Sequence, residues 1–169
     1  MRKSNKPLIN KTRRETICYI LDKSTFNPSL FKRYVDLYYM VKGKRRSLSA
    51  FDLDAIAIQE GLEVLIMCEY NNKLTGSIAL HTFNKKARYN SSVQDPNIER
   101  QIYPNHFLLW QAMVYLKENE FRLFEIGEQV IANESSDLTD KDRNLSHFKA
   151  GWGGELVPWL KVQKMYEYV

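Results

Sequence analysis

The chain has little cysteine, and no arrangement of it suggests a metal or disulfide site. Its 169 residues include only two cysteines, Cys18 and Cys68, which stand apart in apolar surroundings without a CxxC spacing. Isolated cysteines of this kind are typical of small buried hydrophobic side chains in a reducing compartment. We therefore predict no metal site and no disulfide framework.

Long hydrophobic runs are also missing. No stretch approaches the roughly 18 uninterrupted apolar residues of a membrane helix, and the first residues lack the apolar run of a signal peptide. We therefore expect a cytoplasmic protein without a membrane span. Repeats, low-complexity tracts and long linkers are absent as well, and 44% hydrophobic residues suffice for one core. The sequence predicts a basic N-terminal segment, residues 1–14, followed by a single domain, residues 15–169.

Acidic residues are scarce in the first part of the chain. Residues 1–46 contain 13 lysines and arginines but only 3 aspartates and glutamates, whereas the whole chain has a net charge of +5. Such a surface attracts phosphate groups, as in tRNA, a nucleotide-linked sugar, coenzyme A or an anionic membrane leaflet. The alternative is a solvated basic helix that only aids solubility.

Patterns typical of strands and helices follow this basic region. We predict a strand, two helices and an antiparallel meander of three strands, in this order at residues 16–21, 28–43, 48–60, 63–70, 75–83 and 87–93. The meander connections, Asn71-Asn72-Lys73 and Asn84-Lys85-Lys86, are short and polar, as hairpin turns require. A helix capped by Asn105 and a buried strand at residues 121–127 come next.

The most specialised segment is Leu145-Ser-His-Phe-Lys-Ala-Gly-Trp-Gly-Gly-Glu-Leu-Val-Pro158. Phe148 can anchor this segment to an apolar surface, and we expect its three glycines to adopt positive φ and to let the backbone approach a ligand. Lys149 would place a cation beside that bare backbone, which suits the negative charge that develops in acyl or phosphoryl transfer. The alternative is a helix that ends at Lys149, stops at glycine and leads into a strand at Glu155-Leu-Val.

Together with the preceding helix and strand, this segment resembles the C-terminal half of the Gcn-related N-acetyltransferase (GNAT) superfamily. The resemblance is to the branch of the Fem aminoacyl ligases of peptidoglycan and the cellulose-biosynthesis-type acyltransferases, whose Phe-x-x-Gly strand precedes a Phe-Lys-x-x-Phe-Gly-Gly turn. The matching positions are Asn105, Leu108, Ala112, Phe124 with Gly127, Phe148-Lys149 and Trp152-Gly153-Gly154. Trp152 replaces the usual Phe, and the match covers residues 103–159, about a third of the chain.

The resemblance implies an α+β protein of GNAT fold, whose mixed, mostly antiparallel sheet is flanked by helices and splayed between its fourth and fifth strands. Unpaired backbone groups in that opening would bind the donor. The residues expected to line it are Ser91, Ser92, Gln94, Gly127, Glu128 and Gln129. The helix that begins near Asn105 would direct its N-terminus, with His106, at a coenzyme A diphosphate. The usual glycine loop before this helix is missing, and Arg100 would compensate.

The function implied by the resemblance is transfer of an acyl group to a primary amine, such as an amino sugar of a cell-envelope or polysaccharide precursor. The donor would be acyl-CoA or, as a second reading, aminoacyl-tRNA. Lys149 would stabilise the oxyanion, and Glu128 or His147 would hold or deprotonate the amine. Substrate contacts are assigned to Tyr89, Gln129, Phe148, Gly151 and Trp152. His81 is interpreted as a surface residue of a strand. The alternative from another class is a catalytically inactive GNAT-fold module that binds RNA or a protein partner.

Overall fold

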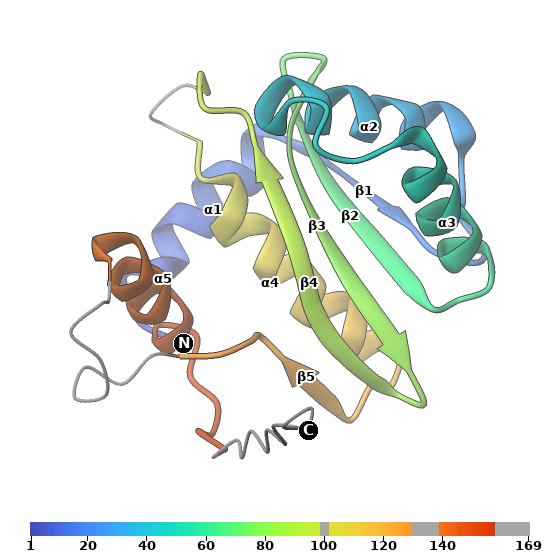
Figure 1. Cartoon of the computed structure of the whole chain (residues 1–169). Coiled ribbons are helices and arrows are strands. Elements are labelled where there is room, and N and C mark those ends of the chain that lie inside the picture. Colours follow the sequence, from blue (N-terminus) through green and yellow to red (C-terminus); the bar gives the residue numbers. More distant parts are fainter. Residues whose placement is uncertain (99–101, 130–138, 158–169) are drawn as a thin grey trace, which may run out of the picture. The chain divides into compact units, whose positions relative to one another are not determined.

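The computed structural model of the chain describes residues 1–98, 102–129 and 139–157 (Figure 1). It contains two compact units, Lys3–Glu128 and Met1–Arg2 with Gln129–Val169. The first unit holds the sheet and helices α1 to α4, and the second holds helix α5. Within the described part of the chain, no helix is both long and apolar enough to cross a membrane.

A five-stranded sheet forms the centre of the first unit. Its strands lie in chain order: β1 (Ile17–Leu21), β2 (Glu63–Tyr70), β3 (Lys73–Phe83), β4 (Lys86–Gln94) and β5 (Leu123–Glu125). Neighbouring strands are antiparallel except β4 and β5, which are parallel. The predicted mixed, mostly antiparallel sheet is confirmed, although β5 is shorter than the predicted strand at residues 121–127.

Two tight turns connect β2, β3 and β4 into the predicted meander. The central residues of the first turn, Asn71 and Asn72, have φ of 50° and 59°, and those of the second, Asn84 and Lys85, have φ of 48° and 59°. Positive φ at both central residues matches the turn to the twist of the strands, and asparagine tolerates this conformation better than most residues. The turn residues therefore fix how β4 lies beside β3.

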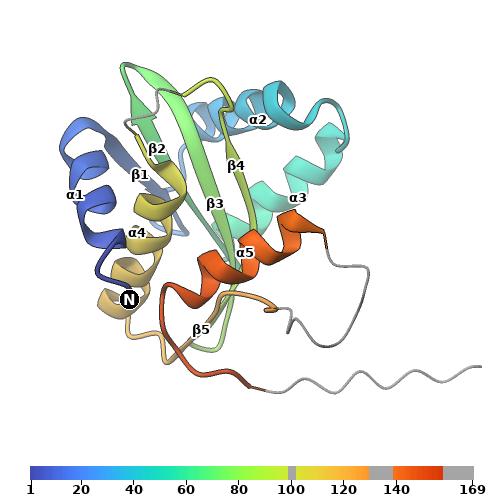
Figure 2. The same cartoon turned by 90° about the vertical axis from the view of Figure 1, so that its left-hand side faces the viewer.

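Helices cover both faces of the sheet (Figure 2). α2 (Pro28–Lys42) and α3 (Leu48–Gln59) lie on one face, and α1 (Asn5–Glu15) and α4 (Pro104–Glu118) lie on the other. The core beneath α2 and α3 includes Phe31, Tyr34, Phe51, Leu65, Met67, Ala79 and Val93. Side chains of a strand alternate between these two faces, so the sequence number of a strand residue determines which helix pair it meets.

α2 and α3 begin and end where their sequences predict. Asn27 Oδ1 accepts the Leu30 N–H at 3.0 Å, and Ser47 Oγ accepts the Ala50 N–H at 3.3 Å. Each bond satisfies one of the amides that a helix N-terminus leaves without an intrahelical acceptor. Gly43 ends α2 with a φ of 66°, which glycine adopts without strain.

Helix α1 lies in the segment that was predicted only to be basic, and it was not predicted from the sequence. Asn5, Ile9 and Thr12 are its buried residues, and Thr12 Oγ1 accepts the Tyr103 N–H at 3.0 Å just before α4 begins. Two of the three buried side chains are polar. The helix therefore lacks the apolar stripe on which a prediction from periodicity depends.

α4 begins at Pro104, so the predicted Asn105 cap is wrong. Tyr103 occupies the N-cap position without a side-chain hydrogen bond. Proline suits the first helical position because its fixed φ is helical and an amide hydrogen there would have no intrahelical acceptor. A Cβ added to Gly76 of β3 would lie 2.9 Å from the Pro104 Cβ. Glycine at position 76 thus lets α4 begin close to the sheet. Gly76 pairs with Gln94, so this close approach lies at the end of β4.

α5 (Asp140–Ala150) is the helix of the second unit. The Thr139 side chain accepts the Asp142 N–H at 3.3 Å, and the Asp142 carboxylate accepts the Thr139 N–H at 3.1 Å. This reciprocal arrangement is a capping box, and it satisfies two amides at the start of the helix. α5 carries the His-Phe-Lys triplet in its last turn.

Candidate functional site

β4 and β5 separate after a short paired stretch. The paired residues are Lys86 with Leu123, Ala87 with Phe124, and Arg88 with Glu125. β4 continues to Gln94, so its residues 89–94 have no pairing with β5 in the described structure. The predicted split between the fourth and fifth strands is therefore present. Backbone N–H and C=O groups on such a strand edge can bind an extended ligand.

A bulge in β4 determines to which face of the sheet each predicted binding residue of this strand projects. The register against β3 shifts so that Asn90 is an extra residue between Tyr89 and Ser91. As a result, Tyr89, Ser92 and Gln94 project to the face covered by α4, and Ser91 projects to the face covered by α2. The Tyr89 hydroxyl hydrogen-bonds the Ser92 side chain, and burial raises the pKa of Tyr89. The structure thus groups three of these four residues.

The first turn of α4 begins at Pro104, which has no amide hydrogen, and continues with Asn105 and His106. The Phe107 N–H donates to the Tyr103 carbonyl at 3.2 Å. Burial lowers the pKa of His106 below its usual value, so its imidazole is neutral at neutral pH. A neutral side chain here leaves the positive end of the helix dipole as the main attraction for an anion.

The loop that joins β4 to α4 starts at a buried carboxylate. Asp95 is 2% exposed, Lys73 Nζ lies 2.7 Å from its Oδ2, and the Asn97 N–H donates to its Oδ1 at 2.9 Å. The hydrogen bond from Lys73 is the main reason that the pKa of Asp95 is lowered. The sequence of this loop contains no glycine with which to form a diphosphate-binding turn. Arg100, predicted to compensate, lies outside the described residues.

In the second unit, the glycines of the C-terminal motif adopt two different conformations. α5 ends at Ala150, and Gly151 has a helical φ of −66°, so the positive φ expected of this glycine is wrong. Gly153 and Gly154 have the expected positive φ, 79° and 101°. Residues 155–157 do not form the strand considered as an alternative.

Aromatic packing fixes the end of α5. The Phe148 and Trp152 rings lie 6.0 Å apart at 72°, an edge-on arrangement, and Trp152 is 5% exposed. Lys149 lies between these two residues in sequence, in the last turn of α5, and is half-buried. Gln129, a predicted substrate contact, is the first residue of this unit after the sheet. Glu128, predicted together with His147 to hold or deprotonate the amine, is an exposed residue of the first unit.

His147 is held by the N-terminus of the chain. Arg2 NH1 lies 2.5 Å from His147 Nε2, and the Arg2 backbone N–H donates to the Gly151 carbonyl at 2.7 Å. A guanidinium has donors only, so Nε2 is the acceptor and carries no hydrogen. The lone pair that Nε2 would use as a general base is therefore already engaged.

A row of titratable side chains crosses the first unit and was not predicted from the sequence. Glu63 of β2 lies opposite His81 of β3, His81 lies opposite Arg88 of β4, and Arg88 lies opposite Glu125 of β5. The Glu63 Oε2 to His81 Nε2 distance is 3.7 Å, and the Arg88 Nε to Glu125 Oε1 distance is 3.2 Å. His81 lies on the strand surface as predicted, with a side chain 58% exposed, but it does so beside a buried acid.

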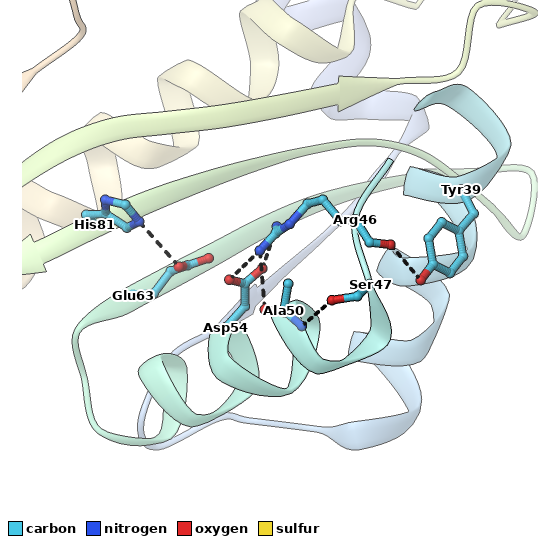
Figure 3. A network of polar contacts seen from close by, with 7 residues as sticks. All are labelled: Tyr39, Arg46, Ser47, Ala50, Asp54, Glu63 and His81. Atoms are coloured by element: carbon cyan, nitrogen blue, oxygen red, sulfur yellow. Dashed lines mark hydrogen bonds and ion pairs between the residues drawn. The ribbon is translucent and has the colours of Figure 1, made fainter. Parts of the chain in front are cut away.

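Glu63 is the buried end of this row (Figure 3). It is 3% exposed and lies between His81 on one side and the Arg46–Asp54 ion pair on the other. That ion pair is bidentate, with N to O distances of 2.7 and 2.9 Å. Burial and the charge of Asp54 raise the pKa of Glu63 to about 8, against an opposing effect of Arg46. At neutral pH the carboxyl therefore holds a proton that it can lose slightly above neutrality.

Metal ligands do not cluster in the described parts of the chain. Within residues 1–98, 102–129 and 139–157, no group of three or more His, Cys, Asp or Glu side chains could hold a metal ion.

No family model and no curated protein matches the sequence. The structure is similar to an aminoglycoside acetyltransferase from an uncultured soil metagenomic sample in complex with sisomicin (TM-score 0.59, 14% identity, 90% of this chain and 99% of that chain covered). It is also similar to an aminoglycoside N-acetyltransferase in complex with CoA (TM-score 0.60, 9% identity, 89% and 94% covered). L-PGS from Bacillus licheniformis matches as well (TM-score 0.57, 12% identity, 82% and 43% covered).

These similarities show that the chain has the GNAT fold. The predicted fold class is therefore confirmed: an α+β protein with a five-stranded mixed sheet, β4 and β5 parallel, and flanking helices. Aminoglycoside acetyltransferases and L-PGS are both among the similar structures, so the fold alone does not select one branch of the superfamily.

Proposed function

We propose that the chain is an N-acyltransferase that moves an acyl group from acyl-CoA to a primary amine. The observation that carries this proposal is the early separation of β4 from β5 after Arg88 and Glu125. The edge of β4 at residues 89–94 can hydrogen-bond the amide groups of an extended pantetheine arm. The first turn of α4 would bind the diphosphate. The similar fold of an aminoglycoside N-acetyltransferase in complex with CoA supports acyl-CoA as the donor.

The reaction requires a neutral amine and a stabilised oxyanion. The amine nitrogen attacks the thioester carbonyl and a C–N bond forms. As the tetrahedral intermediate collapses, the C–S bond breaks, the nitrogen loses a proton and coenzyme A leaves as the protonated thiol. Lys149 is the proposed oxyanion stabiliser, because it lies two residues before Gly151 in the glycine motif. Glu128 or His147 is proposed to hold the amine, and Nε2 of His147 accepts a hydrogen bond from Arg2.

Aminoacyl-tRNA is the second candidate donor, and a specific observation favours it. The loop after β4 has a buried Asp95 where an acyl-CoA enzyme of this fold is expected to have glycines. Helix α1 adds exposed cations that would attract RNA, namely Lys6, Lys11, Arg13 and Arg14. An amino sugar of an envelope or polysaccharide precursor is the proposed acceptor with either donor, and the similar aminoglycoside acetyltransferases support an acceptor of that kind.

Ligand-dependent stability tests the donor directly. Thermal unfolding is followed with acetyl-CoA, uncharged tRNA and UDP-linked amino sugars, because a ligand at 100 times its Kd stabilises the folded state by about 2.7 kcal/mol. Acetyl-CoA should raise the Tm and tRNA should not. A shift with tRNA alone would favour the second donor. No shift with any of the three would contradict both enzyme proposals and favour the inactive binding module.

A negative charge added at the end of β4 tests where the diphosphate binds, and the same charge added at a distant position is the control. Gln94→Glu places a carboxylate on the face of β4 that meets α4, where it should weaken acetyl-CoA binding several-fold at low salt. Gln59→Glu makes the same change at an exposed position of α3. Calorimetry should therefore show weaker binding for the first variant only. Equal affinities would place the diphosphate elsewhere.

A further inference from the structure

The row from Glu63 to Glu125 lies where the sheet begins to split. Arg88 and Glu125 form the last paired position of β4 and β5, and the strand edge proposed to bind the acyl donor starts at the next residue. His81 is the neighbour of Arg88 on β3, and Glu63 is the neighbour of His81 on β2. The split between β4 and β5 therefore begins beside Arg88. The His81 imidazole lies one strand away from Arg88, and the buried Glu63 carboxyl lies two strands away.

All four side chains share one face of the sheet. Residues directly opposite each other on neighbouring strands project to the same side. Glu63 alternates with Val64 and shares its side with Leu65, which packs in the core beneath α2 and α3. The row is therefore on the α2 and α3 face, with Glu63 buried under α3 and His81 exposed beyond the helix.

We propose that His81 and Glu63 form the proton-accepting pair for the acceptor amine, with His81 in contact with the amine and Glu63 acting through His81. This inference deepens the proposed function and rests on it, because it assumes that the reaction takes place at the split of β4 and β5. His81 is the catalytic residue of the pair, and Glu63 is a positioning residue that receives the proton.

The proton path follows from the orientation of the imidazole. Nε2 of His81 faces the Glu63 carboxyl at 3.7 Å, and an approach of about half an ångström brings the two atoms into hydrogen-bond range. With Glu63 ionised, the ring holds its hydrogen on Nε2 and presents a lone pair at Nδ1. The substrate ammonium gives a proton to Nδ1, the Nε2 hydrogen passes to Glu63, and the products are a neutral amine, a neutral imidazole and a carboxylic acid.

The surroundings of Glu63 suit an acceptor that works slightly above neutral pH. The groups that face it are His81 from β3, Asp54 from α3, Arg46 from the connection before α3, and Tyr34 from α2. The resulting pKa of about 8 is close to the pH at which a general base is most effective. Protonated Glu63 would instead donate to Nε2 and leave a hydrogen on Nδ1, so the pair accepts protons only after Glu63 ionises.

Steady-state kinetics with acetyl-CoA and glucosamine, over pH 6 to 10, test the catalytic part. His81→Asn should lower kcat by about 100-fold with an unchanged KM for acetyl-CoA, the size expected for loss of a general base. Glu63→Gln should abolish the rise of kcat/KM through pH 8. Added imidazole should restore part of the activity of His81→Ala, because this position is exposed. Glu60→Gln, an exposed acid at the end of α3, is the matched control with wild-type kinetics.

Nitrogen-15 NMR of the histidine rings tests the pair without turnover. The wild-type spectrum should show His81 changing tautomer near pH 8, and Glu63→Gln should remove that change. A His81 titration that is identical in wild type and Glu63→Gln overturns the inference. Wild-type kinetics in both His81→Asn and Glu63→Gln also overturn it. Failure of wild-type protein to bind acetyl-CoA in calorimetry refutes the proposed donor instead, and that result is independent of the NMR titration.

Discussion

Replacing Glu63 by glutamine should remove a loss of stability that wild-type protein suffers as pH rises. The carboxyl is 3% exposed, and burial together with the Asp54 charge raises its pKa from 4.5 to about 8. Because the folded protein binds this proton more tightly than the unfolded chain, the contribution to stability is fully present below pH 4.5. It is lost as pH rises through 8. Glutamine has a similar shape and does not titrate.

The size of the effect follows from the shift. Each pKa unit corresponds to about 1.4 kcal/mol, so the pKa change of Glu63 corresponds to a total of about 5 kcal/mol. By the linkage relation, about 3 kcal/mol of this contribution to the free energy of unfolding is lost by pH 7, and nearly all of it is lost by pH 9. The free energy of unfolding of Glu63→Gln minus that of wild type should therefore increase by about this amount between pH 4.5 and pH 9.

Urea unfolding at half-unit pH intervals measures this difference, since subtraction cancels the groups that both proteins share. Glu60→Gln serves as the control and should keep the pH dependence of wild type, because Glu60 is exposed. A difference between Glu63→Gln and wild type that stays constant within about 0.5 kcal/mol from pH 5 to pH 9 would refute the reasoning. Such a result would mean that Glu63 reaches solvent in the folded protein.

Three further substitutions test separate parts of the molecule. Lys149→Met should lower kcat by about 100- to 1,000-fold with little change in KM, while urea unfolding shows an unchanged fold; undiminished turnover would reject its proposed role. Gly76→Ala should destabilise the protein by about 1 to 3 kcal/mol in urea, because its Cβ would lie 2.9 Å from Pro104 Cβ; wild-type stability would show that α4 can shift. Tyr115→Phe should cost about 1 to 2 kcal/mol in the same assay, since it removes the 2.8 Å bond to Asp22, and an unchanged midpoint would contradict this.

Most of the fold was predictable because its signals are local. Asn27 and Ser47 cap the helices that follow them, and the asparagine turns at residues 71–72 and 84–85 adopt the φ values that hairpins require. α1 was missed because its buried side includes Asn5 and Thr12, whose roles appear only once α4 lies against them. Tertiary contacts, rather than propensity, stabilise that helix.

The candidate site likewise has one part that local sequence predicts and another part that only the fold brings together. The motif around Lys149 is contiguous in sequence, so its glycines and aromatic anchor could be predicted, although only the structure shows that Gly151 is helical. The Glu63 and His81 pair is invisible in sequence, because 17 intervening residues form parts of two strands and their turn. A shift of one residue in the β2–β3 register would send the His81 side chain to the opposite face. Glu63 and His81 therefore depend on the asparagine turn between β2 and β3, and a change of turn length there should disrupt their pairing while leaving each strand intact.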